Sequence, residues 1–242
     1  MTLSTELCAQ KMNKLTTTMK ALALVLAAAG GAGGVHAQEI KGDAQAGARK
    51  VDMCIGCHGI VGYQASFPEV YKVPKISGQG AKYIANALTA YQAGERKHPS
   101  MRAVAASLSE QDIADLAAYY EQNGKGAGGG AAVSAAPSRQ AGSQVDALLK
   151  KGDCVTCHGA NFSTPSDPAN ARIAGQHADY LYMALLSYKT EKNPQFGRSN
   201  GVMAGVAKKF SNAELKMLAG YIGSLDGELK TVPEGRFHTG AR

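Results

Sequence analysis

The chain has 242 residues, of which 45% are hydrophobic and 19% are charged, and this length suits one or two domains. No uninterrupted apolar stretch reaches the ~20 residues that a membrane-spanning helix needs. The formal net charge is +7, but the basic residues form no stripe interleaved with aromatic side chains. The sequence therefore argues against nucleic acid as a partner.

The first residues have the pattern of a secretory signal peptide. Three lysines precede an apolar run at residues 21–29, and a Gly/Ala-rich stretch then ends in Ala37. A charged start, a short apolar run and small residues before the cleavage site are typical of such leaders. We predict removal of residues 1–37, which takes Cys8 away, with retention as an N-terminal anchor as the alternative.

Two short motifs carry the chemistry. The run Cys-Ile-Gly-Cys-His-Gly at 54–59 recurs as Cys-Val-Thr-Cys-His-Gly at 154–159. C-x-x-C-H is the attachment signature of a c-type haem. Two thiols one helical turn apart add across the vinyl groups of one porphyrin, and the adjacent imidazole then faces the iron. Two covalently bound haem c groups are therefore predicted. Their attachment residues are Cys54, Cys57, Cys154 and Cys157.

Other uses of paired cysteines explain the sequence less well. A zinc site of four cysteines would require two domains to share one ion, and it leaves both His-Gly pairs unexplained. A thioredoxin-type redox pair needs a βαβ context, and the sequence has no alternating strand pattern. Haem attachment agrees with the leader, because c-type haems are attached outside the bacterial cytoplasm. We therefore expect the mature protein in the periplasm.

Landmarks beyond the motifs repeat in the same order, which indicates tandem duplication of one domain. The Ile-x-Gly-Gln pattern within 75–79 is echoed within 172–176. Ser109, with Asp112 three residues later, is placed to cap the last helix of the first repeat, and Ser211 and Glu214 copy this arrangement. The remaining predicted helices lie at 44–53, 81–91, 145–151 and 178–188.

A Gly/Ala-rich stretch separates the repeats. Residues 126–143 contain a glycine run followed by Ala, Ser and Pro, the composition of a flexible linker. The glycines form no phosphate loop, because no Gly-Lys-Ser/Thr follows them. We predict one domain at 38–125 and a second at 144–242.

The sixth iron ligand decides between an electron carrier and a catalyst. Met101 and Met203 occupy matched places after His58 and His158, and His/Met pairs are an established ligand set of cytochromes c. We predict these four residues as the axial iron ligands. His98 is the rival near Met101, although its place before a proline suggests a loop residue.

Residues behind the ligands are predicted from the same duplication. A ligating imidazole normally donates its other N–H to a carbonyl or carboxylate, and the backbone carbonyls of Pro74 and Ala171 are matched candidates for His58 and His158. Tyr83 and Tyr180 are candidates to line the haem crevice, with packing in the core as the alternative. Basic residues that could pair with haem propionates, or remain solvated surface charges, are Lys75, Arg96, Arg172 and Arg198.

With these residues in place, the chain resembles the cytochrome c4 family of diheme periplasmic cytochromes over about 42–224. The resemblance is carried by the two C-x-x-C-H-G motifs, the Ile-x-Gly-Gln segments, the Arg-before-Met pairs and the two capped final helices. It implies an all-α fold of two tandem class I cytochrome c-like domains, each wrapped around one covalently attached haem. The long linker and the tail from Asp226 depart from the family, which weakens the expectation of a fixed interface between the domains.

The resemblance implies electron shuttling from respiratory donors towards a terminal oxidase, with membrane-bound or soluble redox proteins as partners and peripheral membrane association. No acid pair, Ser/His/Asp, Cys/His or zinc-water arrangement remains once the Cys and His residues are assigned to haem, so we expect no enzyme. Two alternatives stay open. One is a diheme electron-accepting subunit of a periplasmic dehydrogenase complex, and the other is an enzyme with one open haem position.

Overall fold

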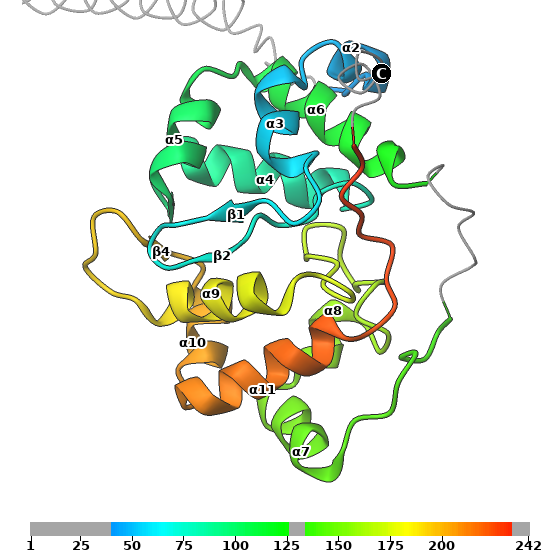
Figure 1. The fold of residues 1–242 in the computed structure, drawn as a ribbon, viewed down its shortest axis with the longest axis vertical. Helices are drawn as coiled ribbons and strands as arrows, with labels where there is room; N and C mark the ends of the chain where they lie inside the picture. The colour runs from blue at the N-terminus through cyan, green and yellow to red at the C-terminus, as the bar shows by residue number, and fades with distance from the viewer. Residues whose placement is uncertain (1–39, 126–133, 234–242) are drawn as a thin grey trace, which may run out of the picture. The chain divides into compact units, whose positions relative to one another are not determined.

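The computed structural model describes residues 40–125 and 134–233, which all belong to one compact unit. The predicted signal peptide and the glycine run of the linker lie outside the described residues. Helices dominate the fold, and they form two lobes joined through the middle of the chain (Figure 1). We call residues 40–125 the first lobe and residues 134–233 the second lobe.

The first lobe begins with two short helices, and the second of them carries the first haem motif. A small antiparallel hairpin then leads to a long middle helix, a short helix and the final helix. The elements are α2 (Ala44–Ala48), α3 (Asp52–His58), β1 (Gln64–Ala65), β2 (Tyr71–Lys72), α4 (Ala81–Gln92), β3 (Arg96–Lys97), α5 (Pro99–Ala106) and α6 (Glu110–Asn123).

The second lobe repeats this order without the hairpin. Its elements are α7 (Ser143–Gly152), α8 (Cys154–His158), α9 (Ala178–Lys189), β4 (Gly197–Arg198), α10 (Gly201–Ala207) and α11 (Asn212–Gly223). The helical class and the tandem arrangement that the sequence predicts are thus confirmed. Helices α5 and α10, which carry the two predicted methionine ligands, were not foreseen from the sequence.

Both final helices begin as the capping signal predicts. Ser109 accepts from the backbone N–H of Asp112, whose carboxylate accepts from the N–H of Ser109 in return. Ser211 and Glu214 make the same reciprocal pair at the start of α11. Satisfying two otherwise free N–H groups in this way fixes where each helix begins.

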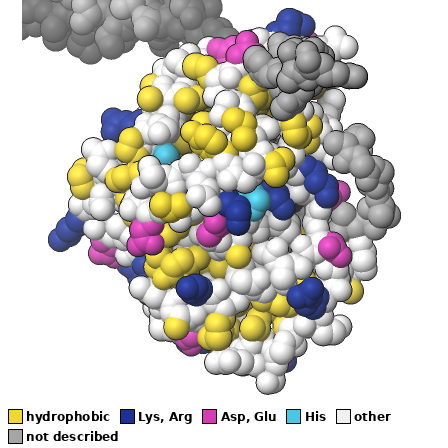
Figure 2. All heavy atoms as spheres, in the orientation of Figure 1, with side chains coloured by type: hydrophobic (Ala, Val, Ile, Leu, Met, Phe, Trp, Pro, Cys, Tyr) yellow, Lys and Arg dark blue, Asp and Glu magenta, His cyan; other side chains and the backbone are white. Residues whose placement is uncertain are grey.

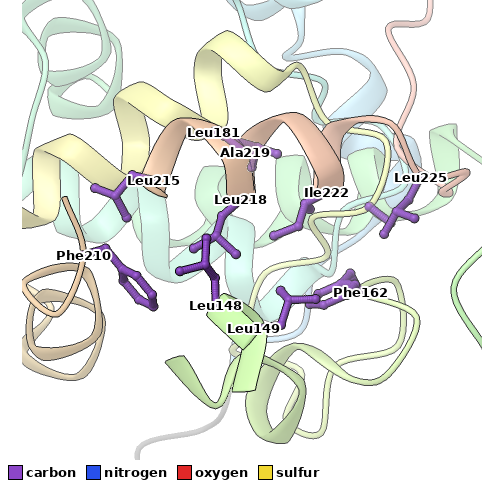
Figure 3. Packing of buried hydrophobic residues seen from close by; sticks show 11 residues of the cluster. Leu148, Leu149, Phe162, Leu181, Phe210, Leu215, Leu218, Ala219, Ile222 and Leu225 are labelled. Atoms are coloured by element: carbon purple, nitrogen blue, oxygen red, sulfur yellow. The ribbon is translucent and has the colours of Figure 1, made fainter. Parts of the chain in front are cut away.

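Each lobe has its own apolar core around its final helix. In the second lobe, α11 packs on α9 and α7, and Leu215 and Leu218 meet Leu148 and Phe210 (Figure 3). The matching cluster of the first lobe is formed by Val51, Ile55, Ile84, Leu116, Ala117 and Tyr120. Burial of such side chains contributes about 1.5–3 kcal/mol each, so each lobe has the core of a separate domain.

The repeated Ile-x-Gly-Gln segments pair with each other between the lobes. The Gln79 side chain donates to the Arg172 carbonyl (2.9 Å) and accepts from the Arg172 N–H (2.9 Å). Gln176 makes the same two bonds to Lys75, at 2.9 and 3.0 Å. This reciprocity is that of a two-fold symmetric dimer interface, here within one chain. The long linker cast doubt on a fixed interface between the two domains, but in this structure the two lobes do form an interface.

Two further segments connect the halves of the chain. The C-terminal segment of the second lobe runs back along the first lobe (Figure 1), where the Lys230 N–H donates to the Ser77 carbonyl at 2.9 Å. The end of the predicted linker packs on the second lobe, since the Tyr221 hydroxyl donates to the Arg139 carbonyl at 2.9 Å. The described part of that linker is therefore structured, contrary to the composition-based expectation.

Candidate haem-binding sites

The two attachment motifs lie on matched short helices. Cys54 and Cys57 stand one turn apart on α3, which ends at His58, and residues three apart share a helix face. In the second lobe, α8 presents Cys154, Cys157 and His158 in the same way. All four thiols are free and partly exposed, so they are available for thioether bonds.

Each motif histidine has one ring nitrogen held by a backbone carbonyl. His58 Nδ1 lies 2.8 Å from the Pro74 oxygen, and His158 Nδ1 lies 2.9 Å from the Ala171 oxygen. Both predicted contacts are confirmed. A donor bond from Nδ1 fixes the tautomer and leaves the lone pair of Nε2 for a metal.

Burial keeps these groups neutral. It lowers the pKa of His58 and of His158, although the carbonyl bonds act in the opposite direction. Burial also raises the pKa of the Cys54 thiol. Neutral imidazole is the form that binds a metal, so the donor set of each motif fits a covalently attached haem.

The two candidate sulfur ligands occupy equivalent positions. Met101 is the third residue of α5, and Met203 is the third residue of α10. Both side chains are partly exposed. In the second lobe the Asn200 side chain accepts from the Met203 N–H at 2.9 Å and fixes the helix start, whereas His98 at the matching position makes no such bond. The iron–sulfur bonds themselves stay a prediction.

Two partly buried arginines meet between the lobes. Arg96 and Arg198 face each other in the antiparallel pair β3–β4. Arg96 donates to the Tyr83 hydroxyl at 3.3 Å, and Arg198 donates to the Tyr180 hydroxyl at 3.1 Å. Each guanidinium also lies over tyrosine rings, with distances to the ring centres between 5.0 and 5.7 Å.

No carboxylate balances these two charges among the described residues, where Arg96 and Arg198 take part in no ion pair. Although burial raises the pKa of Tyr180, the two guanidinium groups outweigh it and bring that pKa down to about 8. Buried charges are normally paired. The arginine pair therefore fits anionic groups such as haem propionates.

Lys75 and Arg172 are used differently from the expectation. The Lys75 ammonium donates to the Gly175 carbonyl at 2.6 Å, and the Arg172 guanidinium donates to the Gly78 carbonyl at 2.6 Å. Arg172 also forms an ion pair with Glu228 at 3.0 Å. Lys75 and Arg172 therefore join the two lobes, in place of the pairing with haem propionates that the sequence suggested.

Three comparisons place the chain among known proteins. The family model described as Cytochrome c matches residues 44–124 and 141–226. Cytochrome c4 of Azotobacter vinelandii is 31% identical over 217 residues, which cover 85% of this chain and 99% of the relative. The crystal structure of reduced cytochrome c4 from Pseudomonas stutzeri matches with a TM-score of 0.54 and 28% identity, over 76% of this chain and 100% of that one.

A fourth similarity concerns a different kind of protein. A thiosulfate dehydrogenase electron acceptor of Thiomonas intermedia is 26% identical over 179 residues, which cover 70% of this chain and 76% of the relative. Both groups of relatives extend over the two lobes, so both bear on how the pair of haem motifs is used.

Proposed function

This chain belongs to the cytochrome c family and, within it, to the diheme cytochromes c4, and from this premise we propose that it transfers single electrons between respiratory partners in the periplasm. It carries two covalently bound haem c groups. A bound haem iron supplies the exchange of one electron between its ferrous and ferric states.

We assign the first haem to Cys54 and Cys57, with His58 and Met101 as its axial ligands. The second haem takes the matching residues Cys154, Cys157, His158 and Met203. The observation that carries the assignment is the duplication of the whole set: each histidine is oriented by a backbone carbonyl, and each methionine is the third residue of a matched helix.

The protein's residues hold the redox centres rather than transform a substrate. The carbonyls of Pro74 and Ala171 fix the two imidazoles. Arg96 and Arg198, paired between the lobes, would compensate the negative charge of haem propionates. Met101 and Met203 would bind the irons on the side away from the histidines, and each iron would then have no free ligand position. A small molecule then has no iron position to occupy, which supports a carrier rather than an enzyme.

The periplasmic location is supported by the N-terminal pattern and by the attachment chemistry. Residues 1–37 have the sequence of a cleavable leader. Among residues 40–125 and 134–233, no helix has both the length and the hydropathy required to span a bilayer. We place the two domains at 38–125 and 144–242, on either side of the linker.

We propose that electrons pass from a respiratory donor through this protein towards a terminal oxidase. The protein would associate peripherally with the membrane when it meets a membrane-bound partner. The alternative is a diheme electron acceptor bound to a periplasmic dehydrogenase, which the similarity to the thiosulfate dehydrogenase electron acceptor favours. Native purification of the tagged full-length chain separates the two. A catalytic chain recovered in equal amount would support the subunit, and a free cytochrome would support the shuttle.

Single substitutions of the two methionines test the carrier assignment. Met101→Ala and Met203→Ala should each remove about half of the far-red absorption that reports methionine bound to ferric haem, because each removes one of two sulfur ligands. Met217→Ala is the matched control, since its side chain packs on the apolar cluster of the second lobe. If the band is unchanged in both ligand variants, the assignment is wrong.

A further inference from the structure

His98 is a partly buried histidine whose ring nitrogens lack hydrogen bonds. Both nitrogens are shielded from solvent, and neither makes a hydrogen bond to a described residue. The ring packs edge-on against Phe67, with 6.1 Å between ring centres. A buried polar group without a partner costs stability and calls for an explanation, such as a ligand that completes its bonding.

The second lobe shows what the same position does without an imidazole. His98 precedes α5 and lies three residues before Met101, while Asn200 precedes α10 and lies three residues before Met203. Asn200 uses its side chain to cap its helix through the Met203 N–H. Because His98 leaves that cap unmade, its side chain serves another purpose.

The imidazole opens into a small cavity between the lobes. The cavity holds about 30 Å³, room for about two oxygen-sized atoms at ~10–15 Å³ each. Its lining includes Tyr71, Arg96, Lys97, His98, Tyr180 and Arg198, and none of its described lining residues is acidic. Two partly buried arginines beside a ring that can donate a hydrogen bond therefore make an environment suited to a carboxylate.

We propose that His98 donates a hydrogen bond to a propionate carboxylate of the first haem in this cavity, and that it thereby distinguishes the first haem from the second. The inference rests on the haem assignment of the proposed function. Burial lowers the pKa of His98, although the Phe67 carbonyl acts in the opposite direction, and the neutral imidazole still has one N–H to donate.

His98 would then be a positioning residue that acts through the haem carboxylate. A donor beside a propionate offsets negative charge that otherwise favours ferric iron, so it favours the reduced state. The second haem has only an amide at the matched position, and that amide is used by the helix. The sequence difference between His98 and Asn200 therefore predicts unequal reduction potentials for the two haems.

The test measures the two reduction potentials of His98→Asn in the full-length holoprotein by spectroelectrochemical titration. His98→Asn should lower one potential through a three- to tenfold change in its one-electron equilibrium constant, or about 30–60 mV at 59 mV per tenfold. The other potential and the far-red methionine absorption should stay unchanged. His98→Phe, which keeps a ring without donors, should give the same shift if the Asn variant folds poorly.

Three results would overturn the proposal. Unchanged potentials in both His98 variants would show that the imidazole does not interact with a haem carboxylate, and equal shifts of both haems would show a general effect on the lobes. A gain of far-red absorption in His98→Asn would show that Met101 had replaced a lost histidine ligand, and it would make His98 an iron ligand in the wild-type protein. Failure of the methionine assignment is visible separately, because it removes the far-red absorption from the wild-type protein.

Discussion

Replacing Gln79 by alanine is expected to lower the free energy of unfolding by about 2–4 kcal/mol, because its buried amide makes three hydrogen bonds, two of them across the contact between the lobes. The side chain donates to the Arg172 carbonyl (2.9 Å) and accepts from the N–H groups of Arg172 (2.9 Å) and Gly80 (3.0 Å). Gln79 is 4% exposed, so water cannot easily replace these partners. At roughly 1 kcal/mol per bond, with an added cost for groups left unsatisfied, the sum falls in this range.

The assay is chemical denaturation of the holoprotein followed by far-ultraviolet circular dichroism. Gln176→Ala is the symmetry-related variant and should cost a similar amount, since it makes the same two bonds to Lys75. Gln195→Ala, an exposed glutamine whose side chain makes no hydrogen bond to a described residue, is the control. If Gln79→Ala loses no more stability than Gln195→Ala, the contact between the lobes is not held by these amides.

Two further predictions concern the Lys50–Asp115 ion pair of the first lobe and the attachment of the second haem. Lys50 forms an ion pair with the buried Asp115 at 2.7 Å. Burial raises the pKa of the Asp115 carboxyl, but Lys50 and the other hydrogen-bond donors outweigh burial and lower it. The wild-type protein should therefore be more stable than Asp115→Asn at neutral pH, and this advantage should vanish as acid protonates Asp115 below about pH 4. Urea denaturation at a series of pH values measures it, and an advantage that persists in strong acid would contradict it. Cys154→Ala combined with Cys157→Ala should leave one covalent haem per chain by mass spectrometry of the denatured protein, and two remaining haems would refute the attachment sites.

Local signals predicted much of each lobe. The capping boxes at Ser109 and Ser211 fixed the starts of the final helices, because they depend only on residues three apart. The carbonyls of Pro74 and Ala171 were found by comparing the two repeats. Duplication thus supplied within one chain some of the information that relatives usually provide.

Contacts between the lobes could not be predicted in the same way. Gln79 and Gln176 repeat in the sequence, but periodicity does not reveal that a glutamine is buried against another domain. Lys75 and Arg172 carry charges that suit propionates equally well, and only the three-dimensional arrangement directs them to backbone carbonyls. Helix α5 was missed because a helix of eight residues is too short to show a clear apolar period, although Pro99 at its first position is typical of a helix start.

The central claim is that Met101 and Met203 bind the two haem irons. Electron paramagnetic resonance of the fully oxidised holoprotein tests this claim most directly when it is recorded alongside a redox titration. Two low-spin ferric signals and two one-electron steps per chain are predicted, with no rapid change when cyanide is added, because sulfur occupies the position opposite each imidazole. A high-spin ferric signal from either haem, or fast cyanide binding at one of them, would mean that this iron is open and that the chain is not simply an electron carrier.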